Sequence, residues 1–138
     1  MRVVGVDLGS RRVGVAVSDL TGTLASPHVV LERSGDVAAD HRRLAEVVAE
    51  LGAERVVVGL PLSLDGRTGA AAEAALEEAE ALAGVVGVPV ETYDERLTTV
   101  SAQQALLAGG TNTRKQRAVI DKAAAAVLLQ SWLDARGR

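Results

Sequence analysis

Two valine-rich segments near the start of the chain alternate with glycines and polar residues at a period of two. Residues 2–8 (RVVGVDL) and 13–18 (VGVAVS) are rich in β-branched residues and enclose residues 9–12 (GSRR). This pattern predicts two strands joined by a tight turn. Residues 28–32 (HVVLE) predict a third strand, and the short connections predict that the three strands run antiparallel.

Beyond residue 35 the apolar period changes to that of a helix. Apolar residues from Val37 to Leu51 keep helical spacing, with Asp36 as the expected N-cap and Gly52 as the expected end. Residues 55–60 (RVVVGL) form a nearly continuous apolar run, which is typical of a strand buried on both faces.

The second half of the chain predicts three helices and one strand. After a loop at 61–69, we expect a helix at 70–86, a strand at 88–93, a short helix at 99–108 and a last helix at 115–135. The order βββαβαβαα predicts a single α/β domain over residues 1–138, with a mixed five-stranded sheet flanked by helices. This order matches the ribonuclease H-like layout.

Composition narrows the possible chemistry. Hydrophobic residues make up 48% of the 138 residues but aromatics only 1%, so base stacking is not expected as the main mode of nucleic-acid binding. The absence of cysteine excludes disulfides, zinc thiolates and cysteine nucleophiles. No apolar run approaches the roughly 20 residues that cross a bilayer, and no signal-peptide pattern is present, so we expect a cytoplasmic protein without a membrane partner.

Charge is distributed unevenly along the chain. The net charge is −3, with acidic residues concentrated in 70–87 and basic residues in 111–138. A local basic patch can bind phosphates on a mildly acidic protein, and the candidate phosphate-binding residues are Arg96, Arg114, Lys115 and Lys122. The alternative is that both charged segments are solvated helix faces.

Asp7 stands out because it occupies a segment predicted to be buried. Strand alternation puts it on one face with Gly5 and Gly9, and the valines on the other. A buried carboxylate is costly unless it is paired or binds a metal, and flanking glycines let a ligand approach closely. The alternative is that Asp7 caps a turn with Ser10.

Asp94, Glu95 and Arg96 follow directly after the last predicted strand. Ligand sites of open α/β sheets lie at the carboxyl ends of strands, where two acids and an arginine suit a metal ion and a phosphate. The pattern does not decide between Asp94 and Glu95 as the acid. The alternative is a polar turn that leads to a helix N-cap at Thr98 or Thr99.

Asp121 lies at the beginning of the apolar stripe of the last predicted helix. Ala125, Leu128 and Trp132 continue this stripe, which should face the sheet. Asp121 is therefore expected to aim a carboxylate inward. The alternative is an acid stabilised by the helix dipole, an effect confined to the first turn.

Three inward carboxylates from separate elements form a minimal ligand set for a divalent ion. Mg²⁺ takes oxygen ligands and keeps waters or phosphate oxygens in its shell, and two such ions can promote phosphodiester cleavage. The residues therefore predict a hydrolase that depends on Mg²⁺ or Mn²⁺. His28 and His41 lack a metal-like spacing and are expected on a strand and on a helix surface.

Four segments of the chain resemble the YqgF family. They are VGVDLGSRRVGVAVSD at 4–19, VVVGLP at 56–61, DERLTT at 94–99 and DKAAAAVLLQSWL at 121–133. The similarity runs through essentially the whole chain, in order and at compatible spacing. Members of this family are described as Holliday-junction resolvases or as nucleases that mature the precursor of small-subunit ribosomal RNA.

The resemblance implies a ribonuclease H-like fold and an acidic triad of Asp7, Glu95 and Asp121, which would be both catalytic and metal-binding. Resolvases of similar fold place two acids one helical turn apart on the last helix, whereas this chain has Ala124 there. Their second acid belongs to an earlier strand, where this chain has residues 59–61 (GLP). Both departures weigh against junction resolution.

We therefore expect a metal-dependent endonuclease that processes the 5′ end of precursor 16S ribosomal RNA in ribosome biogenesis. Its expected partners are nucleic acid, either precursor ribosomal RNA or branched DNA, and ribosomal particles, and it would act as a monomer or homodimer. One alternative is a Holliday junction resolvase in DNA recombination. Another is a non-catalytic RNA- or ribosome-binding module, which would gain nothing from buried acids. A third is an actin-like ATPase or sugar kinase, although 138 residues do not supply the two domains that such enzymes close around a nucleotide.

Overall fold

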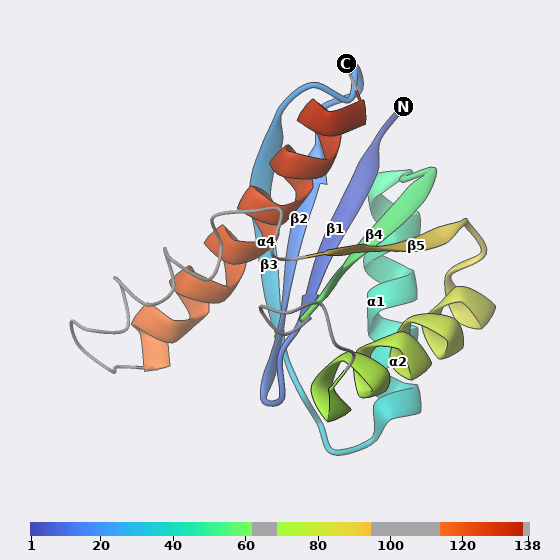
Figure 1. The fold of residues 1–138 in the computed structure, drawn as a ribbon, viewed down its shortest axis with the longest axis vertical. Coiled ribbons are helices and arrows are strands. Elements are labelled where there is room, and N and C mark those ends of the chain that lie inside the picture. Colours follow the sequence, from blue (N-terminus) through green and yellow to red (C-terminus); the bar gives the residue numbers. More distant parts are fainter. Residues whose placement is uncertain (62–68, 95–113, 137–138) are drawn as a thin grey trace.

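The computed structural model describes residues 1–61, 69–94 and 114–136, and for residues 114–121 it describes the backbone alone. Five strands form one sheet in the order β3-β2-β1-β4-β5 (Figure 1). They are β1 (Val3–Leu8), β2 (Arg12–Ser18), β3 (Ala25–Glu32), β4 (Arg55–Leu60) and β5 (Val90–Asp94). The first three strands pair antiparallel, and β4 and β5 extend the sheet in parallel from β1. The predicted mixed sheet is confirmed.

Helices cover both faces of the sheet. They are α1 (Val37–Leu51), α2 (Ala70–Val86) and α4 (Arg114–Arg136). α1 and α2 pack on one face, and α4 crosses the other face over β1, β2 and β3 (Figure 1). Among the described helices, none combines the length and apolar character that a bilayer crossing requires.

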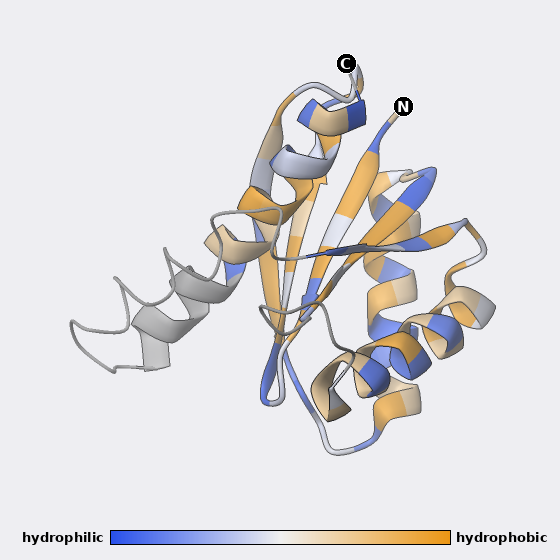
Figure 2. Ribbon diagram, viewed as in Figure 1, coloured by the Kyte–Doolittle hydropathy of each residue, from blue (hydrophilic) through white to orange (hydrophobic). Residues whose placement is uncertain are grey.

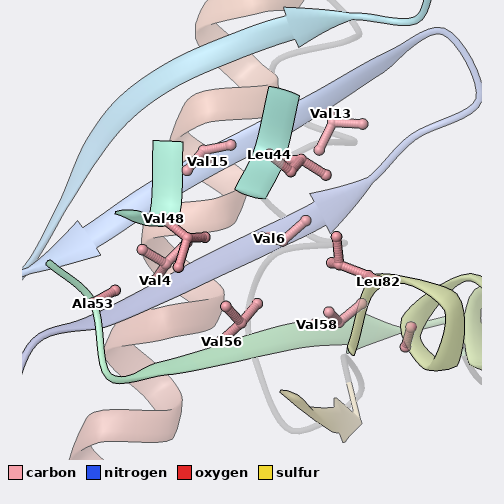
Figure 3. Close-up of a cluster of buried hydrophobic side chains, with 11 residues drawn as sticks. Val4, Val6, Val13, Val15, Leu44, Val48, Ala53, Val56, Val58 and Leu82 are labelled. Atoms are coloured by element: carbon pink, nitrogen blue, oxygen red, sulfur yellow. The ribbon is translucent and has the colours of Figure 1, made fainter. Parts of the chain in front are cut away.

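Hydrophobic clusters on both faces of the sheet form the core. The largest lies between the sheet and α1–α2 and joins strand valines to Leu44, Val48 and Leu82 (Figure 3). The cluster under α4 contains Leu129 and Trp132. The strands of the sheet centre are apolar along most of their length (Figure 2). Valine suits this position because its branched side chain packs well on a pleated surface.

Helix α1 is capped at both ends by the predicted residues, Asp36 and Gly52. The Asp36 carboxylate accepts a hydrogen bond from the Ala39 N–H at 3.2 Å, which satisfies one of the free donors of the first turn. Gly52 adopts a left-handed conformation with φ of 64° and donates its N–H to the Ala49 carbonyl at 3.1 Å. Glycine ends helices in this way at little steric cost.

Element boundaries differ from the predicted ones where local signals conflict. β3 begins at Ala25, three residues before the predicted start, and includes Pro27. Because β3 is an edge strand, a proline without an N–H donor is tolerated there. β5 covers 90–94 in place of 88–93. The short helix predicted at 99–108 lies outside the described residues.

Candidate active site

Asp7 lies on the face of β1 that α4 covers. On the same face, a Cβ atom at Gly5 would lie 2.8 Å from Leu129 Cβ and 3.2 Å from the Ala125 carbonyl oxygen. Val3, two residues before Gly5, belongs to the cluster that contains Leu129. Because strand residues alternate between faces, Asp7 faces the same side, and it is half-buried.

Glycines occupy the positions beside Asp7 on both neighbouring strands. Gly14 is its partner in the β1–β2 ladder. On the other side, Val6 of β1 pairs with Val58 of β4, so the residue of β4 at the level of Asp7 is Gly59. Gly59 in turn pairs with Tyr93 on β5. Since neither glycine carries a side chain, the sheet around Asp7 is backbone that a ligand can approach closely.

The helix that carries Asp121 runs antiparallel to β1. Gly5 packs against Ala125, and Asp121 lies one helical turn before Ala125 in α4. From Gly5 to Asp7 the strand advances by about 6.7 Å, and from Ala125 back to Asp121 the helix advances by about 6 Å. The α4 backbone at Asp121 therefore comes to about the same level along the sheet as Asp7.

Asp94 is the last residue of β5 and pairs with Leu60. On β5, Tyr93 packs against the cluster under α4, whereas Val90 packs against the cluster under α1–α2. Alternation therefore places Asp94, like Val90, on the face opposite to Asp7. Glu95 and Arg96 lie outside the described residues.

Only part of the predicted site is described. Lys122 is half-buried on α4. Arg114 and Lys115 are the first residues of that helix, and their side chains, like that of Asp121, lie outside the described part of the structure. Within the described part of the chain, no three histidine or acidic side chains are grouped so that they could hold a metal ion. The three-acid site stays a prediction, and Asp7 is the member whose strand position and burial are described.

An unpredicted charged network holds the turn that follows Asp7. Arg33 donates its Nε–H to the Gly9 carbonyl at 3.0 Å and its backbone N–H to the Arg11 carbonyl at 2.8 Å. Its guanidinium group donates to both carboxylate oxygens of Glu78, at 2.6 and 3.0 Å. His41 Nε2 lies 2.9 Å from the same carboxylate. We call Arg33, Glu78 and His41 the turn clamp.

The expectation that His41 lies on a helix surface is wrong. His41 is only 2% exposed because its face of α1 packs against α2. Nor does Glu78 belong to a solvated face. Burial raises the pKa of Glu78, but hydrogen bonds from Arg33 and His41 outweigh burial and hold the pKa below its ordinary value. Arg33, His41 and Glu78 lie far apart in the sequence, so no local pattern predicts that they meet. The only feature of the sequence that points to this network is an arginine directly after a predicted strand.

Comparison with known proteins identifies relatives along nearly the whole chain. A family model described as "RuvX: Holliday junction resolvase" matches residues 1–135. A Leifsonia xyli protein is 52% identical over 132 residues, which cover 96% of this chain and 84% of that protein. A Mycobacterium leprae protein is 56% identical over 135 residues, which cover 96% and 72%. Both carry the name "Putative pre-16S rRNA nuclease".

Solved structures agree on the fold. Thermus thermophilus RuvC in complex with a Holliday junction substrate matches with a TM-score of 0.61 at 22% identity, covering 99% of this chain and 96% of that one. A second structure of the same RuvC matches with a TM-score of 0.59. The predicted ribonuclease H-like fold and the resemblance to YqgF proteins are both confirmed. The chain therefore belongs to the RuvX Holliday junction resolvase family, a family of nucleases with the ribonuclease H-like fold.

Proposed function

We propose that Asp7, Glu95 and Asp121 form the catalytic centre of this nuclease and bind Mg²⁺ or Mn²⁺. The observation that carries the proposal is the place of Asp7. It is half-buried on the central strand, on the face under α4, with glycine opposite it. Carboxylate oxygen is the donor that Mg²⁺ and Mn²⁺ prefer, and glycines on the neighbouring strands are typical of places where a ligand approaches the backbone closely.

The other two acids are supported by backbone position. Asp121 is one turn before Ala125, so the α4 backbone reaches the level of Asp7. Asp94 belongs to the face opposite to Asp7 by its strand parity, which leaves Glu95 as the acid after β5 for this centre. An acid from each of three elements would then surround one space under α4.

Each group has a distinct part in the proposed cleavage. When bound, a divalent ion supplies Lewis-acid activation of water and stabilises charge on the leaving oxygen. The three carboxylates hold and orient that ion. Arg96, Arg114, Lys115 and Lys122 hold the backbone phosphates on either side of the scissile bond, which positions the nucleic acid without selecting its sequence.

The substrate we propose is precursor 16S ribosomal RNA, cleaved near its 5′ end. Support comes from relatives that are 52% and 56% identical to this chain and carry that substrate in their names. Precursor ribosomal RNA is packaged during ribosome assembly, so ribosomal particles are the proposed partners and the cytoplasm the proposed location. The chain would act as a monomer or homodimer.

Holliday junction cleavage is the second candidate, and the description of the matching family model favours it. Two features of the chain weigh against it. Ala124, one turn after Asp121, is 4% exposed and packs beside Tyr93, so this position supplies no second helix acid. At residues 59–61 (GLP), where the resemblance implies the second acid of related resolvases, this chain has no acidic residue.

A cleavage panel tests the proposal. Purified protein is incubated with precursor 16S RNA, a four-way DNA junction and plain duplex DNA, each with Mg²⁺, with Mn²⁺ and with EDTA. We expect metal-dependent cleavage of the RNA near the 5′ end of the mature sequence. Symmetric cleavage of the junction alone would favour the second candidate, and binding without cleavage of any substrate would favour a non-catalytic RNA-binding module.

A further inference from the structure

We propose that Arg33 is a positioning residue for Asp7, which acts by fixing the turn between β1 and β2. The inference rests on the proposed catalytic role of Asp7. Asp7 lies two residues before Gly9, the first residue of that turn. Any movement of the turn would therefore move the end of the strand that carries the carboxylate.

Arg33 holds the turn at two points. The Gly9 N–H donates to the Arg12 carbonyl at 3.0 Å and closes the turn. The turn is tight, because a Cβ atom on Gly9 would lie 2.5 Å from that carbonyl oxygen. The carbonyls of Gly9 and Arg11 both accept from Arg33, one from its side chain and one from its backbone. A single residue thus fixes both arms of the turn.

Arg33 is in turn fixed by the helices on the far face of the sheet. Glu78 from α2 accepts two hydrogen bonds from the guanidinium group, and such a bidentate pair fixes the plane of the guanidinium. His41 from α1 contacts the same carboxylate. The next backbone group is held as well, since Ser34 donates its N–H and its hydroxyl to Asp40 Oδ1 at 3.1 and 2.8 Å.

The chemistry of the turn clamp suits positioning better than stabilisation. The side chains of Arg33 and Glu78 are 15% and 16% exposed, and that of His41 is 3% exposed. Ion pairs as buried as this contribute little more to folding than well-packed apolar residues of similar size. Their hydrogen bonds instead fix the orientation of the Arg33 side chain. Metal ligands need such support. Mutating a residue that orients a metal ligand typically lowers metal affinity or activity about 10- to 100-fold.

The test separates geometry from stability with a matched control. Arg33→Gln and Arg33→Lys are compared with Val48→Ala, which removes buried volume from α1 without touching the turn clamp. Cleavage of the substrate identified by the panel is measured well below each melting temperature, to give kcat and KM separately. The rise in Tm caused by Mn²⁺ alone is measured in parallel, and Asp7→Asn serves as the reference without the central carboxylate.

We expect Arg33→Gln to lower kcat about 10- to 100-fold, with a smaller change in KM, and to reduce the Mn²⁺-induced rise in Tm. Val48→Ala should lower Tm while leaving kcat and the Mn²⁺ effect unchanged. If Arg33→Gln does not fold, Arg33→Lys carries the test, because lysine keeps the charge but lacks the rigid planar fork of donors that joins Gly9 to both oxygens of Glu78. The proposal is overturned if the Arg33 variant that folds matches Val48→Ala in kcat and in the Mn²⁺ effect. Normal cleavage by Asp7→Asn would overturn the proposed function itself, whatever the Arg33 variants do.

Discussion

Asp7 and Gly14 lie directly opposite each other in the β1–β2 ladder, on the face of the sheet that α4 covers. The pairing places a carboxylate beside bare backbone at the centre of the fold. The sheet continues on the other side to Gly59 and Tyr93. Mutations at Asp7 are therefore the most direct test of the predicted site, because its position in the sheet is known.

Replacing Asp7 with asparagine should abolish most of the cleavage. The change keeps the shape and removes the charge, so a metal ligand is lost and the rate should fall on the order of a thousandfold. Single-turnover cleavage with saturating Mg²⁺ measures the effect. Near-normal rates for this variant, or for the wild type in excess EDTA, would contradict the metal mechanism.

A methyl group at Gly5 should displace α4. Its Cβ would meet Leu129 Cβ at 2.8 Å, and overpacking of this kind costs about 1–3 kcal/mol. Gly5→Ala should therefore lower both the free energy of unfolding and the cleavage rate, because α4 carries Asp121.

Gly84→Ala is the matched control, since apart from the backbone of its own helix nothing lies within 4 Å of the added methyl group. As a helix-interior glycine it should gain up to about 1 kcal/mol in stability. Urea unfolding and cleavage assays on both variants provide the measurement. Equal behaviour of the two would show that α4 accommodates the methyl group without cost.

Alanine at both Arg114 and Lys115 should weaken nucleic-acid binding for all sequences alike. Losing two phosphate contacts should reduce the slope of log affinity against log salt concentration by roughly one to two units. Cleavage at saturating substrate should change less than in Asp7→Asn, because phosphate contacts bind ground and transition states alike. Fluorescence anisotropy titrations over a salt series test this, and an unchanged slope would mean that these residues only solvate the helix.

Acid should remove the contribution of Glu78 to stability. Its pKa in the folded protein is held below the ordinary value of 4.5, so the stabilisation is present above pH 4.5 and is lost as pH falls through the lower folded value. Glu78→Gln should therefore be less stable than wild type at pH 7, by about 1–3 kcal/mol, because it leaves Arg33 without its charged partner, and the difference should shrink as the pH falls below 4.5. Glu77→Gln, on the exposed side of α2, should stay close to wild type throughout. A gap for Glu78→Gln that is independent of pH would argue against this role.

Local sequence patterns predicted the elements and the position of Asp7, because strand alternation and helix caps depend on neighbours in the chain. The caps at Asp36 and Gly52 and the valine strands followed from such neighbours. The turn clamp did not, because Arg33, His41 and Glu78 meet only after two helices pack against each other. Likewise, the local pattern did not decide between Asp94 and Glu95, although the family resemblance implied Glu95, and the pairing of Asp94 with Leu60 was needed to place Asp94 on the opposite face.

Trp132 is the one tryptophan of the chain, and it lies in the cluster between the sheet and α4, 7% exposed, with the Arg136 guanidinium 5.1 Å from the centre of its ring. Tryptophan fluorescence of this protein therefore reports on the docking of the C-terminal half of α4 onto the sheet. Separation of that helix from the sheet would hydrate the indole, which shifts the emission to longer wavelength, while Arg136, four residues further along the same helix, would stay beside the ring. Since the same helix carries Asp121, an unlabelled sample can be watched optically while metal and nucleic acid are added.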